Sequence, residues 1–147
     1  MGILLGTLPF SVFNPLHFLS FSSSCTHTKV TTNLYGNILE NIGAGLVGGV
    51  GLVPGEDWSH GQIMFGMGVR HDGGNIAGKG IANPTYMLLS LGNMLGKLYF
   101  YKHSDALKAA VLDVLKEGSV LTRDLKGTAT TVQFVDAVLG KMEKNLL

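Results

Sequence analysis

Residues 33–49 read NLYGNILENIGAGLVGG and carry the clearest structural pattern in the chain. Apolar side chains recur there with the spacing of one face of an α-helix: Leu34, Ile38, Ile42 and Leu46. Each glycine in such a helix costs about 1 kcal/mol relative to alanine, so the glycines predict close approach by another backbone or a ligand. We expect the helix to end at Gly48–Gly49, because glycine readily adopts the left-handed cap conformation.

Length and charge restrict the class of protein. The chain has 147 residues and a formal net charge of +1, which fits one domain with its own core. No basic patch stands out, so nucleic acid is not an expected partner. The single cysteine, Cys25, excludes an internal disulfide framework and a cysteine-based zinc site.

Residues 1–30 differ in character from the rest. Met1–Ser24 contains no charged residue, so it lacks the positive start of a signal peptide, and the first arginine is Arg70. Pro9 and Pro15 disfavour a membrane-spanning helix, and we do not expect a membrane partner. We therefore expect residues 1–30 to be a poorly ordered leader and residues 31–147 to form the domain.

Periodicity and turn residues predict the remaining elements. Three further helices are expected over residues 83–98, 104–117 and 131–145. Asn83 and either Thr130 or Thr131 are the expected N-caps, and Gly118 is an expected C-cap. A short buried strand is expected within residues 61–69, an extended piece at 120–125, and polar loops at 56–60 and 70–80.

Common catalytic motifs are weak or missing. Gly73, Gly78 and Lys79 have the spacing of a phosphate-binding P-loop, but Gly80 stands where that loop needs Ser or Thr. The histidines show no metal-ligand pairing, and no GxSxG elbow is present. The residues alone therefore favour neither a P-loop enzyme nor a nucleophilic hydrolase.

Three segments resemble the isocitrate and isopropylmalate dehydrogenase family. NLYGNILENIGAGLVGG is similar to the segment near that family's metal site. NIAGKGIANPT (75–85) and LTRDL followed by GTATT (121–131) are similar to two later family motifs, in the same order. The resemblance runs from residue 33 to about 138. It implies an α/β fold, namely the C-terminal portion of the family's large domain, with mostly helices and one to three short strands.

The resemblance also implies a nucleotide site. In the family, the loop that corresponds to residues 75–85 embraces the adenosine half of NAD, and the candidate cofactor-binding residues here are Asn75, Ile76, Asn83 and Asp124. The family's aspartate at the start of the loop is Asn75 here, and its adenine-packing histidine aligns with Arg70. NAD is therefore a possible but degenerate cofactor.

The expected metal site lacks the two carboxylates that would bind the ion. Active relatives carry GDxxSD, whose two aspartates bind Mg²⁺ or Mn²⁺, and this chain has Asn37 and Asn41 there. One unit-charge pair at about 4 Å is worth about 4 kcal/mol at an effective dielectric constant of 20, or about three decades of affinity. Hard cations prefer charged oxygen ligands. We therefore predict no bound metal and no catalytic residue in this chain alone.

The asparagine pair and MFGMGVRH (64–71) resemble regulatory subunits of the NAD-dependent isocitrate dehydrogenases of this family. That implies a truncated, non-catalytic subunit of a complex that oxidatively decarboxylates isocitrate to 2-oxoglutarate in the tricarboxylic acid cycle. Its partners would be the catalytic and other regulatory subunits, in the mitochondrial matrix. Three alternatives stay open: a divergent catalytic subunit, a membrane-tethered interaction fragment anchored through residues 1–22, and a truncated gene product with no independent function.

Overall fold

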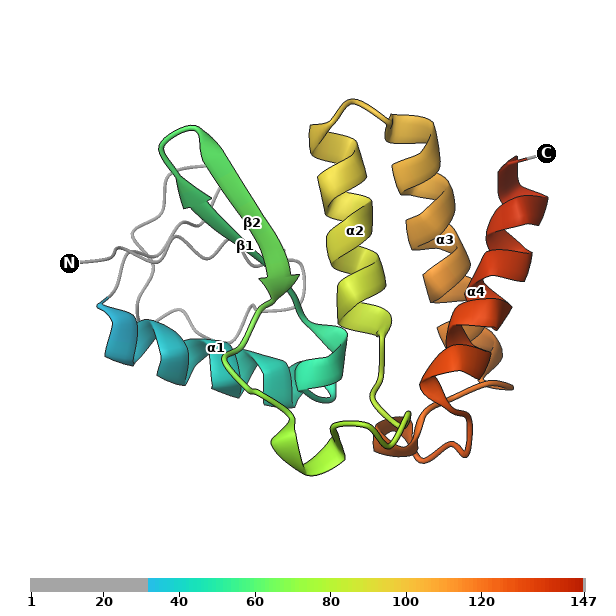
Figure 1. Ribbon diagram of the computed structural model, residues 1–147, viewed down its shortest axis with the longest axis horizontal. Helices are drawn as coiled ribbons and strands as arrows, with labels where there is room; N and C mark the ends of the chain where they lie inside the picture. Colours follow the sequence, from blue (N-terminus) through green and yellow to red (C-terminus); the bar gives the residue numbers. More distant parts are fainter. Residues whose placement is uncertain (1–31, 147) are drawn as a thin grey trace.

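The computed structural model describes residues 32–146, which form four helices, a two-stranded hairpin and three short 3₁₀ turns (Figure 1). The helices are α1 (Asn33–Val47), α2 (Thr85–Lys97), α3 (Tyr101–Glu117) and α4 (Thr131–Leu146). The strands are β1 (Pro54–Ser59) and β2 (Gln62–Met67), and the 3₁₀ turns are η3 (Val50–Leu52), η4 (Gly74–Ile76) and η5 (Arg123–Leu125). This mostly helical architecture with one small sheet confirms the expected partial α/β domain. The expected leader, residues 1–30, lies outside the described residues.

The main core lies between α2, α3 and α4, which pack side by side (Figure 1). Its fully buried members come from two of these helices: Leu107, Ala110, Val111, Val114, Phe134 and Val138. The four from α3 recur every three or four residues, as the sequence predicted. Leucines of α2 pack against this cluster, so the three helices share one apolar interior.

Helix α1 packs through its small residues and exposes its large ones. Its buried residues are Gly36, Gly43 and Ala44, and Ala44 packs with Val53 and Val69 in a second, small cluster. Gly36 and Gly43 are thus buried, but nothing lies within 4 Å of a Cβ built at Gly45 or Gly49, so the predicted close approach is not seen at those two glycines. The apolar face points to solvent, however, with Leu34 67% and Leu46 65% exposed. Gly48, at φ +120°, ends the helix as predicted.

The hairpin corrects one expectation. The sequence predicts a polar loop at residues 56–60, but β1 covers most of them and pairs antiparallel with β2, from Pro54 opposite Met67 to Ser59 opposite Gln62. The strand is polar because its second half is exposed, so pairing with β2 rather than its own composition stabilises it. The expected strand within 61–69 is confirmed as β2.

Two helix-flanking segments also differ from expectation. Helix α3 begins at Tyr101, three residues earlier than expected, although Gly118 caps it at φ +69° as predicted. The sequence predicts an extended piece at residues 120–125, yet Arg123–Leu125 forms a 3₁₀ turn. The Thr122 hydroxyl donates to Asp124 Oδ1 at 2.5 Å, and the Leu125 N–H donates to the Thr122 carbonyl, so local hydrogen bonds curl the chain.

The start of α4 is a reciprocal capping box. The Thr130 N–H donates to Gln133 Oε1 at 2.9 Å, and the Gln133 N–H donates to Thr130 Oγ1 at 3.3 Å. We expect Thr130→Ala to lower the free energy of unfolding by about 1 kcal/mol, measured by urea denaturation. The exposed Thr128 is the matched control. An equal loss for Thr128→Ala would contradict the capping role.

Among the described residues, no helix is long and apolar enough to cross a bilayer.

Candidate functional site

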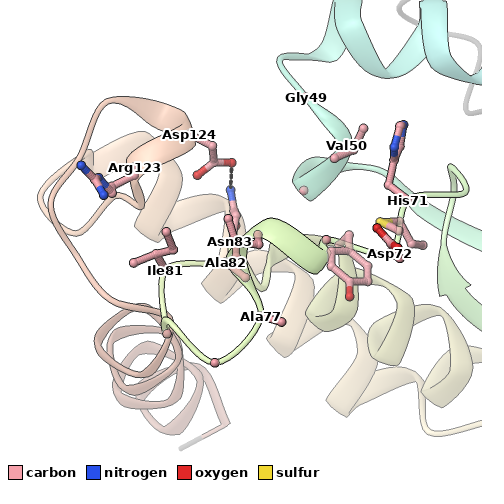
Figure 2. Close-up of a pocket in the computed structure, with 17 residues that line it drawn as sticks. Gly49, Val50, His71, Asp72, Ala77, Ile81, Ala82, Asn83, Arg123 and Asp124 are labelled. Carbon is pink, nitrogen blue, oxygen red and sulfur yellow. Dashed lines mark hydrogen bonds between the residues drawn. The ribbon is translucent and has the colours of Figure 1, made fainter.

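A cavity of about 570 Å³ lies where the loop before α2 meets the turn after α1 and the turn before α4 (Figure 2). Its walls come from residues 49–51, most of residues 71–83, and Arg123 and Asp124, with Met67 and Tyr86 completing them. Ile76, Asn83 and Asp124 are three of the four residues expected to bind a cofactor, and all three line it. Asn75 lies exposed in η4 beside the cavity without lining it.

Asn83 joins two parts of the cavity wall through its side chain. Its Oδ1 accepts the Thr85 N–H at 3.0 Å, and its Nδ2 donates to Asp124 Oδ2 at 2.8 Å (Figure 2). The residue is only 6% exposed. Its amide therefore fixes the start of α2 and holds η5 against it.

Two further contacts bring the distant motifs together. Asp124 also accepts the hydroxyl of the fully buried Thr122, so its carboxylate is held within its own turn while it binds Asn83. At the start of α4, Thr131 donates its hydroxyl to the Ala82 carbonyl at 2.6 Å and its N–H to the Gly80 carbonyl at 2.9 Å. The glycine-rich loop, residues 73–83, is therefore hydrogen-bonded to the start of α4 through Gly80 and Ala82 and to η5 through Asn83.

The glycines of this loop keep its backbone open. Gly73, Gly78 and Gly80 have φ values of +62°, +74° and +61°, which other residues rarely adopt. No atom beyond the chain neighbours lies within 4 Å of a Cβ built at Gly78 or Gly80, so the space beside these two glycines is open to a ligand. Gly51 is tight instead, because a Cβ there would lie 3.0 Å from Asn83 Cβ.

The asparagine pair on α1 is satisfied internally. Asn41 Nδ2 donates to Asn37 Oδ1 at 2.7 Å and to the Asn37 carbonyl at 2.8 Å. Asn41 Oδ1 lies 2.9 Å from His71 Nε2, which therefore donates to it. Because His71 also lines the large cavity, it joins the asparagine pair to the loops that form this cavity. Sequence reasoning missed His71, since thirty residues separate it from Asn41 and no spacing pattern links them.

A second hollow, of about 230 Å³, includes one residue of this pair, Asn37, in its wall. It is lined by Asn33, Leu34, Asn37, Glu40 and Arg70. Burial raises the pKa of the Glu40 carboxyl, the Asp57 carboxylate raises this pKa further, and Arg70 lowers it. Arg70, the residue aligned with the family's adenine-packing histidine, lines this hollow rather than the large cavity. In the described part of the chain, no group of three or more His, Cys, Asp or Glu side chains is placed to hold a metal ion.

Sequence comparison finds relatives over most of the chain. The family model described as isocitrate/isopropylmalate dehydrogenase matches residues 18–138. The beta subunit of the mitochondrial NAD isocitrate dehydrogenase of Bos taurus is 49% identical over 113 residues, which cover 77% of this chain and 29% of that protein. A mitochondrial NAD isocitrate dehydrogenase regulatory subunit from Dictyostelium discoideum is 49% identical over 116 residues, which cover 79% of this chain and 32% of that protein. The chain thus spans about a third or less of the length of these relatives.

Solved structures agree in fold. Isocitrate dehydrogenase from Methylococcus capsulatus superposes with a TM-score of 0.72 at 33% identity, covering 76% of this chain and 33% of that one. The TT0538 protein from Thermus thermophilus gives a TM-score of 0.73 at 34% identity, covering 76% and 23%. With three sequence motifs brought together around one cavity, these matches show that the chain belongs to the isocitrate/isopropylmalate dehydrogenase family.

Proposed function

We propose that this chain is a non-catalytic, regulatory portion of a mitochondrial NAD-dependent isocitrate dehydrogenase. In that complex, isocitrate is oxidatively decarboxylated to 2-oxoglutarate in the tricarboxylic acid cycle. Relatives named as beta, regulatory and mitochondrial subunits support this assignment. The observation that carries it is the asparagine pair, in which Asn41 is bonded to Asn37 and to His71.

The chemistry of the pair argues against a catalytic metal. A divalent ion facing two carboxylates gains several times the roughly 4 kcal/mol of a unit-charge pair, before ion desolvation is subtracted. Neutral amides offer only dipoles, and here a metal would also have to break the Asn41–Asn37 and Asn41–His71 hydrogen bonds. Without the ion, the substrate lacks the Lewis acid that polarises it in active relatives. The pair therefore favours a structural or regulatory role.

The large cavity suits the adenosine part of a nucleotide. Ile76 and Asn83 would flank the base, the exposed Asn75 would face the ribose, and Asp124 would act through Asn83 by fixing its orientation. The open backbone at Gly78 and Gly80 permits close approach of a sugar or phosphate. NAD is the nucleotide that the relatives' names imply, and when bound it would supply the hydride acceptor. The residues of this chain would bind the nucleotide and orient it.

A subunit contact would account for the exposed face of α1. Leu34, Ile38, Ile42 and Leu46 form an apolar stripe that nothing in the described residues covers. Catalytic and other regulatory subunits of a hetero-oligomer in the mitochondrial matrix are the proposed partners. Through α1, the asparagine pair would then lie close to the boundary between subunits.

Titration of Mg²⁺–isocitrate into the purified chain tests the proposal. By calorimetry we expect no binding tighter than about 1 mM, since the loss of about 4 kcal/mol corresponds to about three decades of affinity. The double substitution Asn37→Asp with Asn41→Asp is expected to strengthen Mg²⁺ binding, whereas Asn93→Asp with Asn145→Asp adds the same charge elsewhere and should not.

Two results would overturn the proposal. One is sub-millimolar Mg²⁺–isocitrate binding by the unmodified chain. The other is reduction of NAD by this chain without companions, which would select the divergent catalytic subunit instead.

A further inference from the structure

The turn between α2 and α3 exposes a run of large apolar side chains. Residues 98–101 read LYFY and all four are exposed, with Tyr99 reaching 80%. The rings of Tyr99 and Tyr101 meet edge to face, with centroids 6.1 Å apart. These side chains contribute almost nothing to the core, although soluble proteins rarely gather so much apolar surface in one place.

The backbone of this turn does not require aromatic residues. Tyr99 has φ +66°, a conformation that favours glycine or asparagine and is unusual for a bulky side chain. Phe100 is the N-cap of α3, where serine, threonine, aspartate or asparagine is preferred. Both positions therefore hold an aromatic residue where the backbone conformation favours a different residue type. A binding role for the two rings would explain this choice.

Positive charges flank the aromatic run. Lys97 and Lys102 are both exposed, one on each side of it. Lys97 Nζ also lies 4.6 Å from the ring centroid of the half-exposed Trp58 in β1, which extends the surface to the hairpin. Figure 1 shows the α2–α3 turn and the hairpin tip at one end of the molecule, opposite the loops that form the large cavity. We call this surface the aromatic end: Trp58, Lys97, Leu98, Tyr99, Phe100, Tyr101 and Lys102.

We propose that the aromatic end docks on the surface of an anionic phospholipid bilayer. Tryptophan and tyrosine favour the bilayer interface, because one part of each ring system is apolar and another is polar. Lysines beside them reach the lipid phosphates while their stems cover apolar surface. Aromatic rings suit a protein interface as well as a bilayer, but lysine is depleted at protein–protein interfaces, so the two flanking lysines are what favour an anionic lipid surface. The contact is peripheral, so it does not need the spanning segment that the sequence disfavours.

The single tryptophan makes this docking measurable. Trp58 is the only tryptophan of the chain, so its emission reports on the aromatic end alone. With the full chain, we expect a blue shift on adding vesicles of phosphatidylcholine mixed with phosphatidylglycerol, and none with phosphatidylcholine alone. Added salt should reverse the shift, because it screens the lysine–lipid attraction.

Substitutions that fit the local backbone conformation can test docking without disturbing the fold. Tyr99→Asn fits the positive φ and Phe100→Ser provides a preferred N-cap, so this double variant should fold at least as well. We expect it to lose about tenfold or more in vesicle partitioning, measured by co-sedimentation. Lys97→Gln with Lys102→Gln should lose about thirtyfold. Leu112→Ser with Val132→Ser, which removes exposed apolar surface from α3 and α4 outside any proposed contact, should bind unchanged.

Three outcomes would overturn the proposal. They are equal binding to neutral vesicles, binding that persists in the Tyr99→Asn, Phe100→Ser variant, and self-association of the chain that this variant abolishes while vesicles have no effect. The last would assign the surface to a protein contact.

Discussion

Phe134→Ala is expected to lower the free energy of unfolding by about 3–5 kcal/mol, the range for deleting a fully buried phenylalanine. Phe134 has no solvent exposure and lies in the cluster shared by α3 and α4, with Val111 and Val138 also fully buried. A cavity there removes contacts from both helices at once. Urea denaturation followed by circular dichroism measures the change.

The control for this substitution lies on the same helix. Leu139 is 49% exposed, so Leu139→Ala deletes a large apolar side chain outside the core and should have a much smaller effect. Similar losses for both variants would contradict a core organised around Phe134.

Gly127→Ala is expected to lower the free energy of unfolding by about 3 kcal/mol, the upper part of the usual range for overpacking. A Cβ at this position would lie 1.9 Å from the Leu121 carbonyl oxygen and 2.3 Å from its carbon, so the backbone must move. The movement would disturb the hydrogen bonds from the Gly127 N–H to the Thr122 carbonyl and from the Ala129 N–H to the Leu121 carbonyl. Thermal unfolding measures the loss.

Gly140→Ala is the matched control for this substitution. Gly140 lies inside α4, and nothing lies within 4 Å of its added Cβ, so alanine should stabilise the helix by about 0.5–1 kcal/mol. Opposite signs for the same chemical change would confirm that the turn geometry, not the loss of glycine itself, is responsible. Equal effects at the two positions would contradict it.

The helices were predictable because their evidence is local. The buried residues of α3 recur at helical spacing, and Gly48 and Gly118 end α1 and α3 where glycine caps were expected. Strand β1 was not predictable, because PGEDWS is polar and stabilised by a partner strand rather than by its own pattern. The 3₁₀ turn at Arg123–Leu125 depends on a hydroxyl–carboxylate contact that competes with extended structure.

The site was predictable only in part. The motifs indicated Ile76, Asn83 and Asp124, which line the cavity together although forty-one residues separate Asn83 from Asp124. Motif alignment could not show that the Asn83 amide binds Asp124, or that His71 reaches across to Asn41. Those contacts depend on side-chain geometry between segments that are distant in the chain.

The two separate cores have a consequence for ligand binding. One core belongs to α2, α3 and α4, and the other holds α1 with Val53 and Val69, while α2 joins the two halves by packing on both strands of the hairpin. The large cavity takes Gly49, Val50 and His71 from one half and Arg123 and Asp124 from the other. A molecule bound there fits only when both halves are closed. Its occupancy therefore raises the free energy needed to separate the two halves, because the ligand binds only the closed form.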